Sequence, residues 1–433
     1  MRVFAYLAIT LFCVACSTAP DVDPADQFNP LAEAYVKLAL ALGEHDADYV
    51  DAYFGPADWR VQAGENGQSL ADIAAAATSL AAEVRAIQVS SENYLLLLRQ
   101  DYLGSHLESM AAVASMRNGE VLSFDEESRR VYGFVAPSFP REHYEAALAE
   151  IAAVFPGDAP LYERVNEFEL QFRIPAASIE AVVRAGIDEC RKRTLQHMSL
   201  PEGEAFEFEL VEGNPWGAYN WYQGNYQGLI QVEVSRPKTV FSATRLGCHE
   251  GYPGHHAFSS LLDQNYLQQR GWVELSVLPL FSPQGVIFEG SGDFAEAVAF
   301  PGSSKTTFLR DVILPIAGIN DVDFETRSRY TAAAKELRYA GVEAARKYLD
   351  GDWDRAQTEQ WLINVALRSP DDIESWFGFT ERYRAYGINY VLGEDLVEAY
   401  VRRENPAGGE DGDWLAFAKL LSYPPTPLLI AAD

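Results

Sequence analysis

The chain has 433 residues, with 63 Asp or Glu against 34 Lys or Arg, so its formal net charge at pH 7 is −29. A surface this acidic repels phosphate backbones and anionic lipids, which argues against a nucleic-acid partner and against a basic membrane-binding patch. Apolar residues make up 48% of the chain and charged residues 22%, as in folded proteins, so general disorder is excluded. Four cysteines are too few for a disulfide-rich scaffold.

The N-terminus predicts an export signal. Arg2 precedes an apolar run over residues 3–15, which has the length of a signal-peptide core and is too short for a stable membrane span. Small residues then lead to Cys16, as in the lipobox of bacterial lipoproteins, whose cysteine carries the lipid in the mature protein. We therefore expect a lipoprotein signal peptide at 1–16, a flexible tether at 17–29 and a folded domain at 30–433. Cys13 replaces the usual Leu of the lipobox, so plain secretory cleavage is the alternative.

This signal predicts a protein of the bacterial cell envelope, anchored by lipid and facing the periplasm, or else soluble there or secreted. No later segment is long and apolar enough to cross a bilayer, so we expect membrane contact only through the N-terminal lipid. The compartment is oxidising, but the sequence does not decide whether Cys190 and Cys248 pair.

Most of the mature chain is predicted to be helical, because apolar residues recur at spacings of three and four in Ala- and Leu-rich segments. These segments are 31–42, 69–87, 94–116, 142–155, 174–198, 330–349, 355–365, 371–386 and 392–402. One strand is expected at 227–234, where side chains alternate. The aromatic-rich stretch 214–226 is interpreted as a long ordered loop over a pocket, with ordinary aromatic packing as the alternative. We expect a mostly α fold with two helical lobes around a catalytic cleft and a small β-sheet edge.

Three of the seven histidines lie within eight residues, at His249, His255 and His256, and Glu250 follows the first of them. Two neutral imidazoles and a neighbouring carboxylate are what a catalytic zinc ion needs, the carboxylate taking a proton from the metal-bound water. A spacing of six or seven residues does not place two imidazoles on one face of a straight helix. Pro253 breaks the helical hydrogen bonding between them, so a bulge or break is expected to return one of the paired histidines to the ion.

A third ligand is expected from the segment 288–296. Glu289, Asp293 and Glu296 are spaced four and three, so a helix places all three carboxylates on one face. Flanking phenylalanines indicate that this face is partly buried, where three acids repel one another unless a cation lies opposite. We expect Glu289 to bind the zinc, and Asp293 or Glu296 to orient a ligand histidine from behind.

The segments His-Glu-Gly-Tyr-Pro-Gly-His-His at 249–256 and Phe-Glu-Gly-x-x-x-x-x-Glu at 288–296 resemble the large bacterial domain-of-unknown-function family numbered 885. Its members are mostly helical, often carry signal peptides and are generally taken to be zinc metallopeptidases. The resemblance spans roughly residues 30 to 430. This chain departs from the family at Ser291 and Gly292, where a Trp-Ala pair is usual, which concerns the shape of the substrate pocket more than the metal site.

More distantly, Gly254-His255 and the pair Glu289 and Asp293 are similar to the gluzincin peptidases of the angiotensin-converting-enzyme and oligopeptidase type. In those enzymes a Gly-His closes the first motif, and a Glu with an Asp four residues later supplies the third ligand and its support. The likeness implies that His255 is the second histidine ligand, with His256 as the alternative.

The same resemblance implies roles for a late tyrosine-rich segment, 382–390. Gluzincins of this type present one or two tyrosine hydroxyls to the oxyanion of the tetrahedral intermediate, where a donor offsets developing charge. The candidates here are Tyr386 and Tyr390, with Arg382 as an anchor for a peptide carboxylate.

The expected activity is hydrolysis of peptide bonds. Zinc held by His249, His255 and Glu289 activates a water, and Glu250 accepts its proton and passes it to the leaving amine. The strand at 227–234 is expected to bind an extended peptide through main-chain hydrogen bonds. Residues 30–433 are thus expected to form a helical metallohydrolase domain. Two alternatives stay open: a zinc hydrolase acting on a non-peptide amide or ester, and a catalytically inactive lipoprotein that keeps zinc for stability and acts by binding partners. The oligomeric state and the substrate sequence are not predicted.

Overall fold

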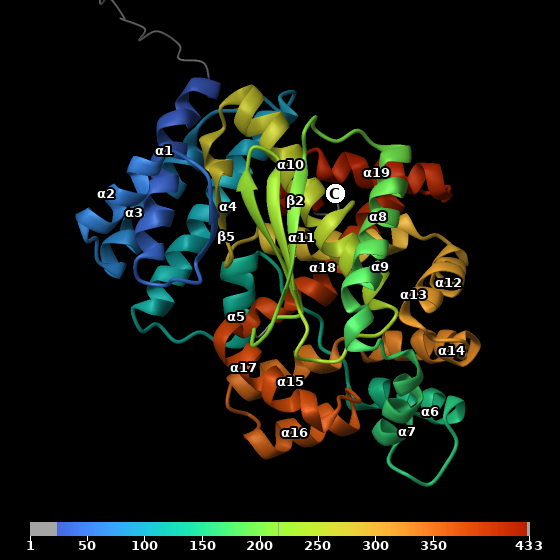
Figure 1. Cartoon of the computed structure of the whole chain (residues 1–433). Coiled ribbons are helices and arrows are strands. Elements are labelled where there is room, and N and C mark those ends of the chain that lie inside the picture. The colour runs from blue at the N-terminus through green and yellow to red at the C-terminus, as the bar shows by residue number, and fades with distance from the viewer. Residues whose placement is uncertain (1–23, 215, 431–433) are drawn as a thin grey trace, which may run out of the picture.

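The computed structural model describes residues 24–214 and 216–430 and is mostly helical, with 67% helix and 7% strand (Figure 1). The predicted mostly α fold is thereby confirmed. The first ten helices are α1 (Pro24–Gly43), α2 (Ala57–Asn66), α3 (Leu70–Ala86), α4 (Tyr94–Arg117), α5 (Phe124–Glu127), α6 (Arg141–Val154), α7 (Leu161–Glu169), α8 (Ile179–His197), α9 (Ser242–Leu246) and α10 (His255–Leu262). The later helices are α11 (Gln284–Ala299), α12 (Ser304–Phe308), α13 (Leu314–Ala317), α14 (Phe324–Ala334), α15 (Ala340–Leu349), α16 (Arg355–Asn364), α17 (Ile373–Tyr383), α18 (Ile388–Glu404), α19 (Glu410–Leu421) and α20 (Pro427–Ile430).

Local signals explain several helix starts. The Ser69 hydroxyl accepts the backbone N–H of Asp72 and caps α3, and Pro140 directly precedes α6. Two predicted helices are wrong in extent: 330–349 is divided into α14 and α15 by a 3₁₀ turn, and 371–386 ends as an α-helix at Tyr383. Helices α2 and α7 were not predicted, because their short segments mix charged residues with few apolar ones. Helix α19 was also not predicted, although its apolar residues are buried.

The expected tether is partly wrong. Residues 24–29 belong to α1, where the Phe28 side chain is fully buried, so burial of apolar surface orders this segment. The expected signal peptide, its lipidation site Cys16 and residues 17–23 lie outside the described residues. Within the part of the chain that the structure describes, no helix is long and apolar enough to cross a bilayer.

Two small sheets accompany the helices. The larger has the strand order β2-β4-β3, with β2 (Ala205–Val211) parallel and β3 (Ala218–Gly224) antiparallel to the central β4 (Gln227–Glu233). The smaller pairs β1 (Val50–Tyr53) with β5 (Val277–Pro279). The expected loop at 214–226 is therefore wrong over β3. Aromatic residues favour a strand there, and Asn225 and Tyr226 take positive φ values of 52° and 65° in the tight turn to β4.

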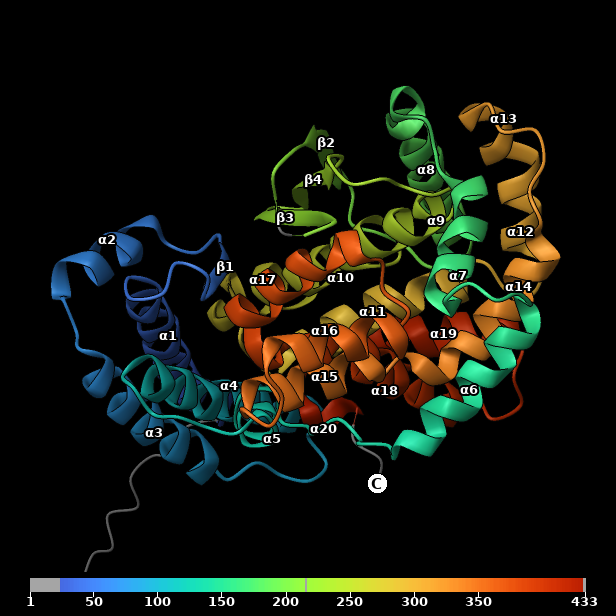
Figure 2. The ribbon, with the colours of Figure 1, turned by 90° about the horizontal axis from the view of Figure 1, so that it is seen from below.

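Buried apolar side chains form two clusters that meet along α11 and α18. Val286 of α11 belongs to the cluster built largely from α1, α3, α4, α15 and α17, whereas Ile287 belongs to the cluster around α8, α10, α19 and the larger sheet. The two helices touch at Gly290 and Gly393, where a Cβ on Gly290 would lie 2.2 Å from the Gly393 backbone. Figure 2 shows α11 and α18 in the middle of the molecule, with the sheet on one side. A residue on α11 therefore lies at the boundary between two cores.

Candidate metal centre

The segment that carries the clustered histidines breaks between them. Helix α9 continues into a π-helical turn, Gly247–Gly251, which ends before Pro253, and α10 begins at His255. Gly254 lets the chain fold back against the π-helical turn before α10 begins, because a Cβ at this position would lie 1.9 Å from the carbonyl oxygen of His249. The predicted break is present, and the restarted helix places the His255 ring against the His249 ring, with centroids 4.5 Å apart.

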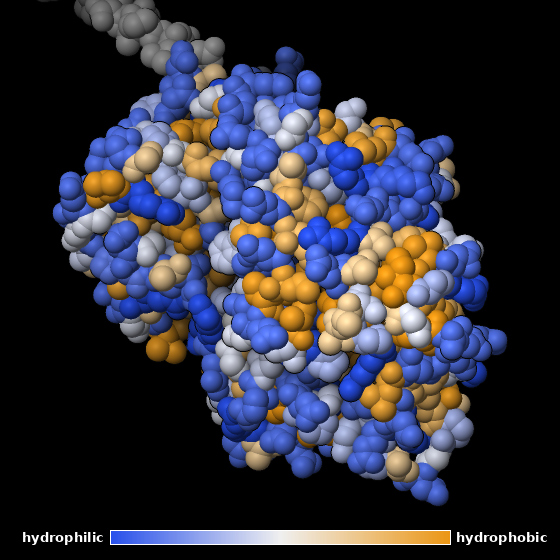
Figure 3. All heavy atoms as spheres, viewed as in Figure 1, coloured by the Kyte–Doolittle hydropathy of each residue, from blue (hydrophilic) through white to orange (hydrophobic). Residues whose placement is uncertain are grey.

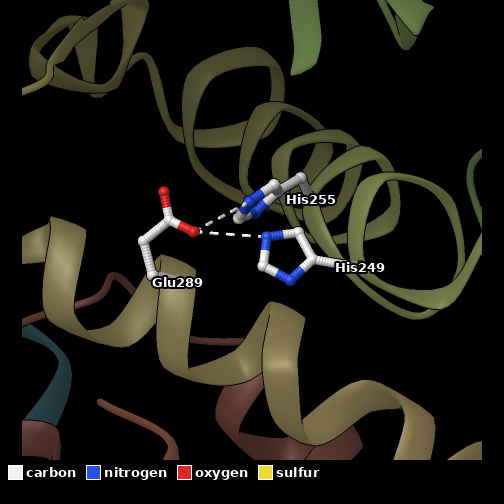
Figure 4. A group of neighbouring side chains, drawn as sticks. All are labelled: His249, His255 and Glu289. Carbon is white, nitrogen blue, oxygen red and sulfur yellow. Dashed lines mark hydrogen bonds and ion pairs between the residues drawn. The ribbon is translucent and has the colours of Figure 1, made fainter. Parts of the chain in front are cut away.

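His249, His255 and Glu289 converge from the π-helical turn, α10 and α11 (Figure 4). One carboxylate oxygen, Oε2 of Glu289, lies 3.2 Å from Nε2 of His249 and 3.7 Å from Nε2 of His255. One potential ligand atom from each residue lies within 4.8 Å of the other two. Figure 4 shows both imidazoles facing the same carboxylate. These three residues are the set expected from the sequence.

The spacing of these atoms fits a zinc ion. Ligands about 2.0–2.1 Å from a tetrahedral zinc lie roughly 3.3 Å from one another, close to the two nitrogen–oxygen distances observed here. Nδ1 of His255 is buried and has no hydrogen-bond partner among the described residues. Two imidazoles and one carboxylate are also a donor set that catalytic zinc sites use, with the fourth position left for water or substrate.

Neighbouring groups orient two of the three candidate ligands. Oδ1 of Asp293 lies 3.0 Å from Nδ1 of His249, which leaves Nε2 for a metal ion, and Tyr386 donates its hydroxyl to Oε1 of Glu289 at 2.5 Å. Burial disfavours the charged His249 ring, but Asp293 and Glu289 outweigh it and hold its pKa well above the ordinary value. Burial also opposes ionisation of Glu289, yet the two imidazoles hold its pKa well below the usual range. The carboxylate is thus the anionic side of a tightly coupled cluster.

His256, the alternative ligand, faces away from this cluster. Its side chain is fully buried, and Nε2 lies 3.1 Å from Oε2 of Glu204, beside Tyr252 and Phe206. Consecutive positions on a helix point about 100° apart, so only one of the paired histidines can face α11. The geometry places His255 at the centre and gives His256 a packing role against the sheet.

Glu250, the expected general base, lies beside the candidate metal centre but is not one of its three candidate ligands. Its side chain is 6% exposed, lies on the wall of the cavity that also contains His249 and His255, and has no hydrogen-bond partner among the described side chains. The amide of Asn220 on β3 donates to the Glu250 backbone carbonyl at 2.6 Å and fixes the position of the turn. Burial raises the pKa of Glu250 above its ordinary value. A raised pKa makes this carboxylate a stronger proton acceptor than an exposed one.

The two late tyrosines occupy different positions. Tyr386 donates its hydroxyl to the carboxylate of Glu289, so it orients a candidate ligand and is not directed at an oxyanion. Tyr390 lines the same cavity, and its hydroxyl has no partner among the described residues. Burial holds the pKa of Tyr390 well above the ordinary value, so this phenol keeps its proton. Of the two expected donors, Tyr390 is the one placed to donate.

Two further expectations are wrong. Glu296 forms an ion pair with Lys305 of α12 at 2.5 Å, because it lies near the end of α11 beyond the reach of His249. Arg382 forms two hydrogen bonds to Asp48 at the surface, at 2.6 and 2.8 Å, and does not line the cavity of the metal centre. Neither residue can therefore take the role that the sequence indicated.

The cavity at the centre has a volume of about 120 Å³ and receives side chains that the sequence did not single out. Asp51 of β1 accepts the hydroxyl of Tyr219 on β3, and both residues line the cavity beside Asn220. Burial raises the Asp51 pKa to about 6, against the hydrogen bond from Tyr219. The aromatic-rich stretch 214–226 was the available signal for Tyr219 and Asn220, whereas nothing in the sequence pointed to Asp51.

The strand next to this cavity is β3, not β4. The expected peptide-binding strand at 227–234 is central and pairs on both sides, so its main chain has no free hydrogen-bonding edge. β3 pairs with β4 on one side only. Because Gly217 accepts a bond from Glu233, alternate residues from Ala218 onward direct their backbone groups away from β4.

Gly292, one of the two departures from the family pattern, contacts the metal centre. A Cβ at this position would lie 2.8 Å from the His249 ring, a distance at which the ring or the helix must shift. The ring therefore packs directly on the backbone of α11, one turn after Glu289. The small residue affects the placement of a candidate ligand as well as the pocket.

No protein-family model matches this chain, and no curated protein does. Among solved structures it is similar to a candidate lipoprotein from Colwellia psychrerythraea, with a TM-score of 0.50 and 15% sequence identity. The match covers 86% of this chain and 68% of that chain. At this identity the similarity concerns the fold alone, so this chain shares the mostly helical architecture of that structure.

Proposed function

We propose that this chain is a zinc-dependent metallopeptidase, and the observation that carries the proposal is the convergence of His249, His255 and Glu289 with Glu250 beside them. The resemblance to the domain-of-unknown-function family numbered 885 and to gluzincin peptidases supports the same assignment. A zinc used only for stability does not need a free carboxylate on the cavity wall next to it. Glu250 has no partner among the described side chains, which favours a catalytic role over a purely structural one.

In the proposed reaction each residue of the site has a separate role. A zinc ion held here would polarise the scissile carbonyl and make its water acidic. Glu250 accepts the proton of the attacking water and returns it to the leaving nitrogen. Tyr390 donates a hydrogen bond to the carbonyl oxygen as negative charge develops on it. Asp293 and Tyr386 hold His249 and Glu289 in position, and the free edge of β3 aligns an extended substrate.

The proposed location is the bacterial cell envelope, with a lipid on Cys16. Two observations support it: the apolar N-terminal run that ends in small residues and a cysteine, and the similarity to a candidate lipoprotein. An enzyme there would meet peptides of the periplasm, in agreement with a cavity that opens beside a strand edge.

Metal analysis together with peptide hydrolysis tests the proposal. Purified protein should contain about one zinc per chain and should cleave a mixed peptide library. Glu250→Gln should keep the zinc and lose about 100-fold or more in rate, because the amide cannot accept a proton. His249→Ala and Glu289→Ala should lose most of the zinc. Full zinc content in both of these variants, or a zinc protein that cleaves esters or small amides but no peptide, would contradict the assignment.

A further inference from the structure

A second and larger cavity adjoins the metal centre. It has a volume of about 620 Å³, within the range of roughly 300–1,000 Å³ typical of ligand pockets. His249, Glu250 and Tyr390 line both cavities, so a substrate bound at the metal centre can extend into the larger space without leaving the protein.

The walls of this cavity carry the opposite charge to the rest of the chain. Acidic residues outnumber basic ones 63 to 34 in the whole sequence, and hydrophilic side chains predominate on the face in Figure 3. The acidic residues on the wall are Glu250 and Asp372. The basic residues on the wall are Arg236, Lys238, Arg245, Arg338, Arg368 and Arg384.

Part of this positive charge is already neutralised by the protein. Arg338 pairs with Glu394 and Asp395, and Arg384 pairs with Glu127. Among the described residues, Lys238, Arg245 and Arg368 form no salt bridge to a carboxylate. Their charges remain directed at the cavity and its solvent.

Lys238 is the strongest evidence that the cavity is built for an anion. It follows β4, is 9% exposed, and its ammonium group has no hydrogen-bond partner among the described residues. The carboxylate that acts on it, Glu233, accepts the backbone N–H groups of Asn214 and Ser235. Burial and the charges of Arg236 and Arg245 lower the Lys238 pKa to about 8. An ammonium group kept in such a place costs stability, and proteins retain such costs where binding requires them.

Arg245 links the basic wall to the catalytic residues. It lies on α9, four residues before His249, and its exposed side chain borders the cavity. Arg236 extends the wall on the other side of Lys238. Its guanidinium donates to the Ser375 hydroxyl at 3.0 Å and to the Trp216 carbonyl at 2.6 Å. The cavity thus presents a group of cations beside the proposed reaction centre.

We propose that this cavity binds a carboxylate of the substrate, so that the protein selects peptides bearing a negative charge on the side of the scissile bond that enters the basic cavity. That the bound peptide is a substrate rests on the proposed function. Binding of its carboxylate does not require hydrolysis. A carboxylate here pairs with Lys238 and Arg245, whose charge-assisted hydrogen bonds are stronger than neutral ones. The carboxylate comes either from a peptide C-terminus or from an Asp or Glu side chain.

Binding to the Glu250→Gln protein tests this without cleavage. The probes are N-acetyl-tetraalanine with a free C-terminus, its C-terminal amide, and the amidated peptides N-acetyl-Ala-Ala-Glu-Ala and N-acetyl-Ala-Ala-Gln-Ala. By calorimetry, at least one carboxylate peptide should bind about tenfold or more tightly than its neutral partner, the gain expected of one charge-assisted contact. Preference for the free C-terminus identifies the terminal carboxylate, and preference for the Glu peptide identifies the side chain.

Two variants and one control locate the effect. Lys238→Met, and independently the exposed Arg245→Gln, should abolish the preference while leaving binding of the neutral peptides unchanged. Lys192→Met removes a surface lysine paired with Glu189 on α8 and should keep the preference. Equal binding of charged and neutral peptides, or a preference that survives both variants, would overturn the inference.

The two proposals fail in different ways. A zinc protein that hydrolyses peptides but binds charged and neutral ones equally contradicts only the carboxylate site. A protein that prefers carboxylate peptides but contains no zinc and hydrolyses nothing contradicts only the peptidase.

Discussion

Asp293 lies one helical turn after Glu289 on α11, and its carboxylate oxygen is 3.0 Å from Nδ1 of His249. One helix therefore supplies a candidate ligand and the group that orients another candidate ligand from a different segment. The hydrogen bond fixes the proton on Nδ1 and leaves Nε2 of His249 directed at Glu289, 3.2 Å away. The rigidity of α11 thus determines the geometry of the whole centre.

Replacement of this orienting carboxylate should weaken metal binding. We expect Asp293→Ala to lower zinc affinity about 10- to 100-fold, the effect usual for a group that supports a ligand histidine. Competition with a chromogenic chelator measures it. Glu296→Ala is the matched control, since it removes a carboxylate from the same helix that pairs with Lys305. Equal zinc affinities in the two variants would show that the hydrogen bond to His249 has no role in binding.

Replacement of His255 and replacement of His256 should have different effects on zinc binding and on stability. His255→Ala removes an imidazole that faces Glu289, so we expect loss of most zinc with the fold retained. His256→Ala removes a buried imidazole beside Glu204, so we expect zinc to remain and thermal stability to fall, by about 1–3 kcal/mol for a broken buried hydrogen bond. Metal content and thermal unfolding of both proteins provide the test. Loss of zinc in His256→Ala alone would reverse the assignment.

Replacement of Tyr390 should lower the catalytic rate, whereas replacement of Tyr386 should weaken zinc binding. Tyr390→Phe removes a hydroxyl that has no partner among the described residues, and it should lower kcat about 10²- to 10³-fold with zinc retained, as for an oxyanion donor. Tyr386→Phe removes the donor to Oε1 of Glu289 and should instead weaken zinc binding about tenfold. Zinc titration and steady-state kinetics distinguish the two effects. A Tyr390→Phe protein with normal kcat would assign the oxyanion contact to another group.

Lys238 should make stability depend on pH. Burial, with Arg236 and Arg245, lowers its pKa in the folded protein to about 8, whereas the unfolded chain has the ordinary value of 10.5. Below pH 8 both states hold the proton and the full cost of the buried charge is present. Between pH 8 and 10.5 only the unfolded chain holds it, so stability rises with pH there.

Comparison with Lys238→Met isolates this effect. At pH 7 the variant should be more stable than the natural protein, on the order of 1–3 kcal/mol, and the difference should shrink toward pH 10. Denaturant unfolding at several pH values measures both quantities. A variant that is less stable at pH 7 would show that the ammonium group contributes to the fold through a favourable contact.

The chemistry of the centre was predictable because most of it is local in sequence. Glu250 adjoins His249, and the four-residue spacing of Glu289 and Asp293 on a helix is enough to place both on one face. The zinc and the peptidase activity remain predictions. The break at Pro253 was also predictable, but its direction depended on the close approach of Gly254 to the His249 carbonyl, which only the folded backbone contains.

Other contributions depend on contacts between distant segments. Asp51 reaches Tyr219 across 168 residues, and a single sequence carries no sign of that pairing. Tyr386 and Tyr390 lie in different positions after the end of α17, where Arg384 takes a φ of 52° and the chain changes direction. The alternating Phe and Glu residues of β2 indicate a strand. The sequence does not indicate that β4 pairs with a strand on each side.

The disulfide between Cys190 and Cys248 joins α8 to the residue directly before His249. It closes a sequence separation of 58 residues that contains the whole of the larger sheet and the basic residues of its following loop. In the chain-entropy model, a disulfide that closes a loop of this length lowers the entropy of the unfolded chain and so stabilises the fold by about 4 kcal/mol. A protease that cuts anywhere between the two cysteines therefore produces two fragments that stay covalently joined, with the β2-β4-β3 segment still attached to the histidine-bearing turn. Such a nicked molecule runs as one band on a gel until it is reduced, and the turn that carries His249 stays linked to α8.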